Sequence, residues 1–220
     1  MWIKRNIPSL VIIGIMLVIS FFYHGSLPAT IPTHFDFYGN PDGYSSKNLV
    51  VVLMPMVFLF VLAITNILVR LSPKIYSMPN SKKSLDRILF GTGLLLFGIH
   101  LSYIMAPGPL EVNSLSTRMS SAGIAGFLIV VGNMFGKSER NFFVGFRLPW
   151  TIASDANWKA THRLAGRLMV GWGVLLLILI PFHSQISIAI LGAILSALIS
   201  CGYSFWYYLE KERPFEEKIN

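Results

Sequence analysis

Apolar runs of transmembrane length alternate along the whole chain with shorter polar and basic segments. The runs are 17 to 23 residues long, and about 20 residues cross the hydrocarbon core of a bilayer as an α-helix. Because backbone polar groups in lipid must pair within their own segment, each run is predicted to be helical. The pattern therefore predicts an all-α polytopic membrane protein, a bundle of six transmembrane helices. The predicted spans are Ile7–Tyr23, Leu49–Leu71, Ile88–Met105, Met119–Phe135, Leu164–Phe182 and Ile186–Tyr208.

The charge of the chain is unevenly distributed between the two predicted sides. The 220 residues are 54% hydrophobic and 13% charged, with a net charge of +8. If the connections alternate across the membrane, one side receives only Lys47 and Arg118, and the other side receives the remaining 16 of the 18 basic residues. Basic residues concentrate in cytoplasmic segments, so both termini are predicted to be cytoplasmic. This distribution explains the net charge without a nucleic-acid partner. The expected partner is the lipid bilayer.

The connection between the first two spans is predicted to be an external loop of defined shape. Alternation over His34–Tyr38 predicts a short extended segment. Gly39 and Gly43 can adopt positive φ without a Cβ penalty, and Pro41 is predicted to fix a turn between them. Two interpretations stay open: the loop presents its polar side chains to a ligand, or it only caps the bundle. The residues singled out are Pro32, His34, Asp36, Gly39, Pro41, Asp42, Gly43 and Lys47.

The longest cytoplasmic connection, residues 136–163, is predicted to lead into an amphipathic helix capped at its start by Ser154 or Asp155. Side chains four residues apart form stripes along one helix face. One interpretation is that the basic stripe anchors on anionic lipid headgroups, at about 1 kcal/mol per basic residue. The other is that an aromatic and basic face binds an acidic partner. The first stripe is Trp158, His162 and Gly166, and the adjacent basic stripe is Lys159, Arg163 and Arg167.

A constrained backbone precedes this helix. Arg147 lies between Gly145 and Pro149, so we expect its guanidinium to have a fixed partner such as a carboxylate or a carbonyl. The residues singled out in this segment are Asn141, Gly145, Arg147, Pro149, Trp150, Asp155, Trp158, His162, Arg163 and Gly166.

Small residues repeat every four positions on the last predicted span, from Gly192 through Ser196 and Ser200 to Ser204. Such stripes let helix backbones approach closely in lipid, where no hydrophobic force drives their association. The stripe is predicted to pack within the bundle, and the alternative is a contact between two copies of the chain in a homo-oligomer.

No motif of an enzyme or a metal site is found in the sequence. His24, His34, His100 and His183 are predicted to lie near the external face, and imidazole is a zinc ligand and a pH sensor. However, no pair has the spacing of a metal motif. There is no G-x-S-x-G, H-E-x-x-H or phosphate-binding loop, and no predicted span has an acidic residue in its middle. We therefore expect no enzymatic activity, no cofactor and no bound metal.

Together the two polar segments resemble the SdpI family of six-span membrane proteins. The pattern Asn141-x3-Gly145-x-Arg147-x-Pro149-Trp150-Thr151, followed by Asp155, Trp158, His162, Arg163 and Gly166, carries the resemblance. The external loop resembles the uncharacterised N-terminal domain that commonly precedes it, which reads roughly P-x-H-[FW]-x-x-x-G-x-P-D-[GA]-x-x-x-K. Leu148 departs from the small polar residue that many relatives have. The resemblance divides the chain into 1–72, with two spans and the external loop, and 73–220, with four spans and the cytoplasmic segment.

This resemblance implies an immunity protein that protects a cell from a secreted, membrane-active toxin peptide. Some members of the family also signal by capturing a cytoplasmic repressor. In this interpretation the external loop senses or excludes the peptide, and the cytoplasmic segment transmits the state or holds the bundle. The alternative function, from a different class, is a small transporter or channel for a metal ion, a peptide or a lipid.

Overall fold

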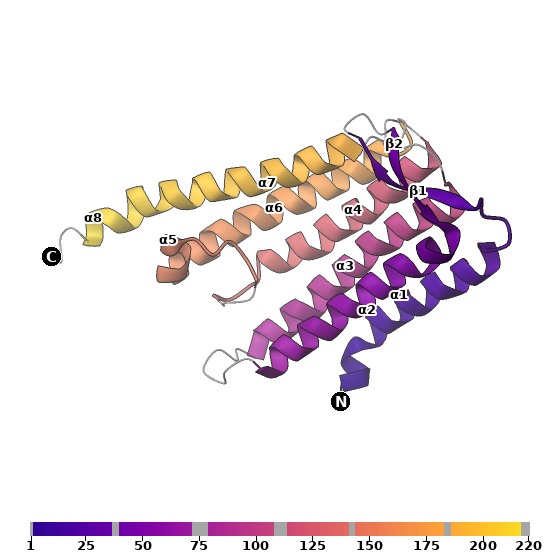
Figure 1. Ribbon diagram of the computed structural model, residues 1–220. Coiled ribbons are helices and arrows are strands. Elements are labelled where there is room, and N and C mark those ends of the chain that lie inside the picture. Colours follow the sequence, from indigo (N-terminus) through magenta and orange to yellow (C-terminus); the bar gives the residue numbers. More distant parts are fainter. Residues whose placement is uncertain are drawn as a thin grey trace.

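The computed structural model describes residues 2–36, 40–71, 79–107, 114–140, 144–182 and 186–216. Six long helices dominate it (Figure 1), which confirms the predicted all-α bundle. Each is long and apolar enough to cross a membrane. The long helices are α1 Trp2–Tyr23, α2 Lys47–Leu71, α3 Pro79–Met105, α4 Leu115–Phe135, α6 Asp155–Leu179 and α7 Ile186–Tyr207. The short elements are β1 Thr30–Phe35, β2 Pro41–Ser46, α5 Pro149–Ala153, a π-helical turn at Tyr208–Glu212 and α8 Arg213–Glu216.

Two helices begin well before the predicted spans. Helix α6 starts at Asp155 rather than at Leu164, and α3 starts at Pro79 rather than at Ile88. In both cases a polar and basic stretch continues the transmembrane helix without a break. The predicted domain boundary falls within 72–78, outside the described residues, and stays a prediction.

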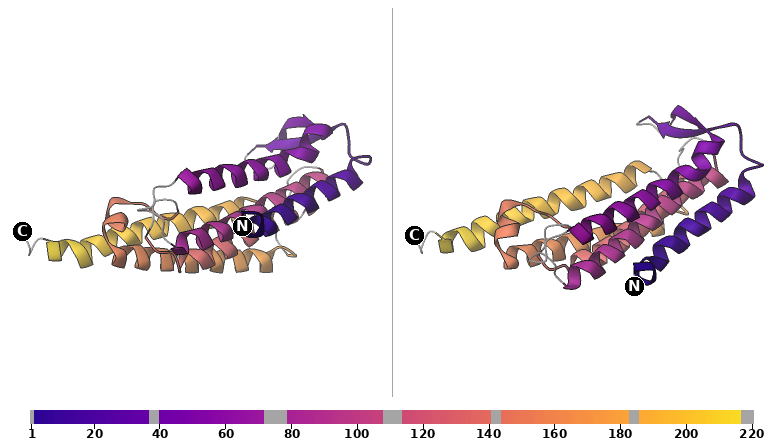
Figure 2. Two further views of the ribbon diagram at one scale, coloured as in Figure 1. Left: turned by 90° about the horizontal axis from the view of Figure 1, so that it is seen from below. Right: turned by 60° about the horizontal axis from the view of Figure 1, so that its bottom comes forward.

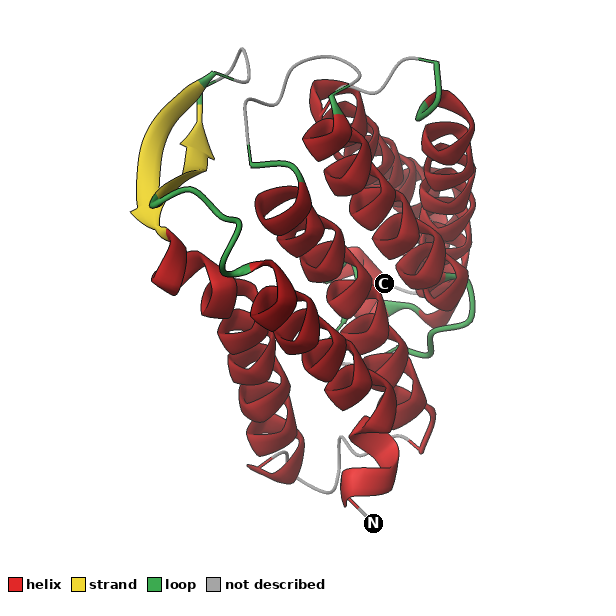
Figure 3. Ribbon diagram, turned by 90° about the vertical axis from the view of Figure 1, so that its right-hand side faces the viewer, coloured by secondary structure: helices red, strands yellow, loops and turns green. Residues whose placement is uncertain are grey.

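Helices α3 and α4 form the centre of the bundle, and glycines set their spacing. A Cβ atom at Gly98 would lie 2.6 Å from Gly123 Cα, so the two backbones meet directly. Helix α4 meets α6 in the same way, because a Cβ atom at Gly166 would lie 2.5 Å from Gly132 O. Helices α1 and α2 lie on one side of this centre and α7 on the other (Figures 1 and 3). Small residues thus bring the central helices together, as expected in lipid.

The outer helices present large apolar side chains to the surroundings. Phe21 is 80% exposed, Phe60 64% and Leu198 62%. A soluble protein rarely exposes such broad apolar surface, whereas lipid contact covers it. The small-residue stripe of α7 faces inward instead, since Ser196 is 6% exposed and Ser200 and Ser204 are fully buried. The stripe therefore packs within one chain, as predicted, and a homo-oligomer stays a prediction.

The external loop folds into a small antiparallel hairpin of β1 and β2, which projects beyond the helices (Figure 2). Strand β1 overlaps the predicted extended segment only at His34 and Phe35, residues 37 and 38 of that segment lie outside the described residues, and two details of the predicted turn are wrong. Pro41 begins β2 and pairs with Phe35. Gly43 is paired with His34 in the hairpin and has no positive φ; its small size matters because a Cβ atom there would lie 2.9 Å from His34 Cβ. Gly39 lies outside the described residues.

Candidate functional site

The two polar segments lie at opposite ends of the bundle. The hairpin follows α1 and leads into α2, and we call its side the hairpin end. The segment 144–154, with α5, and the C-terminal turn after α7 lie at the other end, which we call the motif end (Figure 1). An even number of spans places α8 and the start of α1 on the same side as the motif.

His162 organises the motif end. Its Nε2 accepts a hydrogen bond from the backbone N–H of Phe146 at 2.9 Å, and its Nδ1 lies 2.8 Å from the carbonyl oxygen of Trp158. Because Nε2 accepts, the ring proton is on Nδ1 and is donated to that carbonyl. The neutral imidazole therefore ties the loop before α5 to the second turn of α6.

Gly145 makes this contact possible. Its φ is +127°, a backbone conformation that other residues rarely adopt. A Cβ atom at Gly145 would lie 2.2 Å from His162 Nε2 and 3.0 Å from Trp158 Cη2. Both the conformation and the available space thus require glycine, which explains why the sequence places this residue directly before Phe146.

Trp158 and His162 are inside the protein. Trp158 is 1% exposed, stacks on the imidazole with 4.0 Å between ring centroids, and donates from Nε1 to the carbonyl of Ser138 at 3.1 Å. Phe135 and Phe146 pack edge-on against the same imidazole. The predicted aromatic and basic docking face is therefore wrong in its aromatic half, because the aromatic stripe of α6 is its packed side.

The turn before α6 is held by Thr151, Pro149 and Ser154. The hydroxyl of Thr151 accepts from Leu148 N–H at 2.9 Å and lies 2.6 Å from Phe146 O. Pro149 occupies the first turn of α5, where its missing N–H costs nothing. Ser154 is the N-cap of α6 and accepts from the backbone N–H of Asn157, as predicted.

Helix α7 and the turn that follows it are tied to the motif by three side-chain hydrogen bonds. Trp150 Nε1 donates to Ser204 Oγ at 2.9 Å. The fully buried Asn157 donates from Nδ2 to Ser204 O and to a carboxylate oxygen of Glu212, both at 3.1 Å. Asn157 was missed in the sequence, although it lies on the same buried side of α6 as Trp158 and Thr161. Its position on that inward stripe is the signal that would have identified it.

The charged residues of the motif are exposed, unlike the buried Trp158. Asp155 forms an ion pair with Arg140, whose Nε lies 2.9 Å from Asp155 Oδ1 and whose Nη1 donates to the carbonyl of Ile152. Arg147 is exposed, and its expected fixed partner stays a prediction. Arg163 is also exposed. Asn141 lies outside the described residues.

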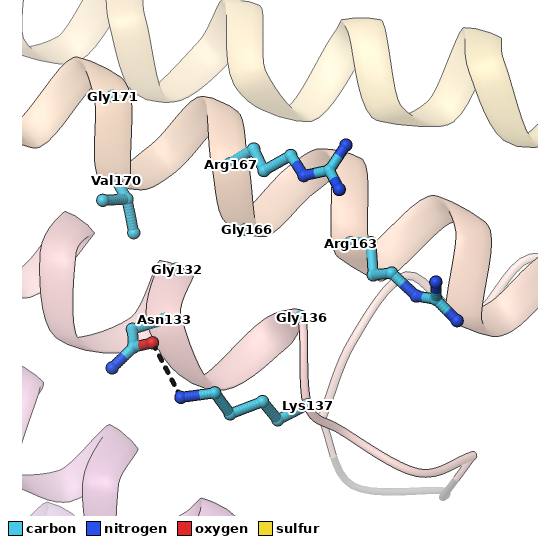
Figure 4. A pocket seen from close by; sticks show the side chains of 9 residues that line it. All are labelled: Gly132, Asn133, Gly136, Lys137, Arg163, Gly166, Arg167, Val170 and Gly171. Atoms are coloured by element: carbon cyan, nitrogen blue, oxygen red, sulfur yellow. Dashed lines mark hydrogen bonds between the residues drawn. The ribbon is translucent and has the colours of Figure 1, made fainter.

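A groove lies between α4 and α6 at this end (Figure 4). It has a volume of about 480 Å³. Glycines leave its floor free of side chains, among them Gly132 and Gly166, where the two backbones meet. Lys137, Arg163 and Arg167 supply its charge. Lys137 Nζ donates to Asn133 Oδ1 at 3.0 Å.

At the hairpin end, the polar side chains named in the sequence pair with one another. His34 Nδ1 lies 2.5 Å from Asp42 Oδ1, and both side chains are substantially exposed. Asp36 closes the tip of the hairpin, since its carboxylate accepts from the backbone N–H and the side-chain amide of Asn40. Lys47 points back and donates to the carbonyls of His24 and Leu27. Lys47 thus anchors the hairpin, while His34 and Asp42 face outward.

The base of the hairpin is fixed to the bundle. Ile31 is fully buried and belongs to an apolar cluster with Val50 and Ile104. Pro32 is also buried, and Tyr103 Oη donates to Thr33 O at 3.3 Å. The hairpin is therefore seated on α3 and α2 as a defined structure rather than a slack linker.

The histidines at this end are not gathered into one site. His24 is bonded to Asn48, while His100 lies inside the bundle, with Nε2 3.1 Å from both Ser20 Oγ and Met16 O. His183 lies outside the described residues. Within the described ranges, no three His, Cys, Asp or Glu residues lie close enough to hold a metal ion.

Comparison with known proteins adds to this geometry. Residues 137–207 match the SdpI/YfhL protein family, and residues 11–59 match a domain of unknown function, DUF1648. The chain is also 29% identical over 208 residues to the immunity protein SdpI of Bacillus subtilis strain 168, covering 93% of this chain and 96% of that protein. No solved structure matches.

The two matched regions contain the two polar segments, so the resemblance predicted from their motifs is confirmed. Six apolar helices and similarity to SdpI agree on the architecture. The chain is a multi-pass membrane protein in which residues 11–59 match DUF1648 and residues 137–207 match the SdpI/YfhL family.

Proposed function

We propose that this protein gives its cell immunity to a secreted, membrane-active toxin peptide. One observation carries the proposal: the similarity to the immunity protein SdpI extends over 93% of this chain and 96% of that protein. A similarity of this extent includes both ends of the bundle and every span, so it is not confined to a shared packing motif.

The hairpin end is proposed to face the outside and to meet the peptide. The division of basic residues supports this orientation, since Lys47 and Arg118 are the only basic residues on that side. His34 is paired with Asp42 on the exposed face of the hairpin, while Asp36 holds its tip. Two carboxylates on a seated hairpin at the membrane surface suit a cationic peptide, because opposite charges steer association.

The motif end is proposed to report the state of the hairpin to the cytoplasm, where a repressor would be captured. A continuous series of packed elements supports this role. Tyr103 of α3 is bonded to the hairpin, α3 meets α4 at Gly98, α4 meets α6 at Gly132, and His162 of α6 holds the loop at Gly145. Contacts between closely packed helices transmit small shifts rather than absorb them.

Survival and transport measurements separate this function from the transporter alternative. Immunity predicts that a sensitive host expressing the protein survives the toxin, while proteoliposomes containing the purified protein show no flux of metal ions, peptides or lipids. Flux above that of protein-free liposomes, without protection of the host, would favour a transporter instead.

A further inference from the structure

The groove between α4 and α6 has the properties of a binding site that the proposed immunity function does not use. In the part of the chain that the structure describes, it is lined by Lys137, Arg163 and Arg167, and by no acidic residue. Among the described residues, the ion pairs at this end involve Arg140 and not these three cations. Three positive charges therefore line a groove of about 480 Å³.

The shape of the groove follows from its glycines. Gly132 and Gly166 lie at the contact between the two helices, where a side chain would collide with backbone. Gly171 lies farther along α6, and a Cβ atom there would have no neighbouring atom within 4 Å, so this glycine leaves open space at the far end of the groove. The floor is thus backbone, and the charges stand at its rim (Figure 4).

Beyond the groove, which ends at Gly171, the exposed surface of α6 is apolar. Arg167, Gly171, Val174 and Ile178 are spaced so that they fall on one face of α6. Val174 is 43% exposed and Ile178 58%. A ligand along this face would meet cations at one end and bare apolar helix at the other, which is the polarity of a phospholipid and not of a soluble anion or an acidic peptide.

We propose that this groove binds one anionic phospholipid, with its phosphate between Lys137, Arg163 and Arg167 and an acyl chain along Gly171, Val174 and Ile178. Guanidinium groups suit phosphate because their planar donors bind its oxygens in pairs. Exposed arginine and lysine side chains change rotamer rapidly, so the three cations can converge on one headgroup. The lipid fills the groove and bridges α4 and α6 where their backbones meet.

Binding is measured by native mass spectrometry on the purified full chain in detergent, with phosphatidylglycerol and phosphatidylcholine as probes. We expect selective binding of phosphatidylglycerol. Arg163→Gln with Arg167→Gln should weaken it about 30-fold, as expected for two cations near the headgroup. The matched control is Arg70→Gln with Arg87→Gln, which removes the same charge from exposed positions on α2 and α3 and should change affinity less than about twofold.

Gly171→Leu tests the apolar part independently, because the open space there accepts a side chain without disturbing the fold. It should weaken binding of the phospholipid while all three cations remain. If the two double arginine variants lost affinity for phosphatidylglycerol equally, binding would reflect only diffuse attraction to the charged surface, and the proposal would be overturned. Displacement of phosphatidylglycerol by inorganic phosphate, or an unchanged affinity in Gly171→Leu, would overturn the proposed binding of an acyl chain along α6. Preferential binding of an acidic peptide would overturn the proposal, because the ligand of the groove would then be a protein.

Discussion

Gly145 lies against His162 so closely that a Cβ atom at position 145 would be 2.2 Å from the imidazole Nε2. The same nitrogen accepts the backbone N–H of the next residue, Phe146. The glycine and the histidine therefore act as one unit, since the hydrogen bond forms only if position 145 has no side chain. This pair joins the loop of the motif to the helix that follows it.

Gly145→Ala should destabilise the protein by about 2 to 5 kcal/mol. The positive φ costs a non-glycine residue about 1 to 2 kcal/mol, and a displaced Phe146 N–H loses its acceptor at a cost of about 1 to 3 kcal/mol. Thermal unfolding of the purified protein and its amount in the membrane measure the effect. Gly202→Ala on α7 is the control, because nothing lies within 4 Å of its Cβ position; it should be neutral or slightly stabilising. Equal behaviour of the two variants would contradict the assigned role of Gly145.

Arg147→Ala should separate signalling from structure. Arg147 is exposed beside the packed core of the motif, so its removal should leave the amount of protein and the peptide resistance largely intact, while a transcriptional response is lost. His162→Ala, which removes the acceptor of Phe146 N–H, should instead lower protein amount and resistance together. Normal signalling by a well-expressed Arg147→Ala protein would rule out Arg147 as a docking residue.

Much of this architecture could be predicted from the sequence, because the signals are local. Apolar runs of membrane length define six helices, and the repeat of small residues on the last span indicates that this helix packs within the bundle. The pairing of Gly145 with His162, and of Trp150 with Ser204, joins residues far apart in sequence. No period or spacing reports such contacts. For the same reason Trp158 looked like part of a surface stripe: an amphipathic pattern shows that two faces differ, but not which face is buried when one is aromatic.

Asp36→Asn combined with Asp42→Asn should lower peptide resistance without lowering the amount of protein. Asparagine keeps an oxygen that can accept from His34 at position 42 and from Asn40 N–H at position 36, so the hairpin should persist while two negative charges are lost. Resistance assays with quantified membrane protein test this. Asp36→Ala, which removes both bonds at the tip, reports what a loosened hairpin does. Unchanged resistance in the double asparagine variant would assign peptide contact to the apolar bundle.

Thiol labelling should place the two ends of the bundle on opposite sides of the membrane. In a Cys201→Ser background, which removes the single native cysteine, Asp42→Cys should react with an impermeant maleimide in intact cells. Ser81→Cys and Asp155→Cys should react only after the cells are opened. External labelling of either cytoplasmic position would overturn the orientation inferred from the basic residues.

The immunity function is tested by deleting the gene in its source organism and challenging the cells with a broad panel of membrane-active peptides. The panel should include the culture supernatant of the parent strain. At least one peptide should kill the deletion strain at a concentration that the parent survives. The chain supplied on a plasmid should restore survival, and Gly145→Ala should restore less. Equal killing of parent and deletion strains across the whole panel would contradict an immunity function.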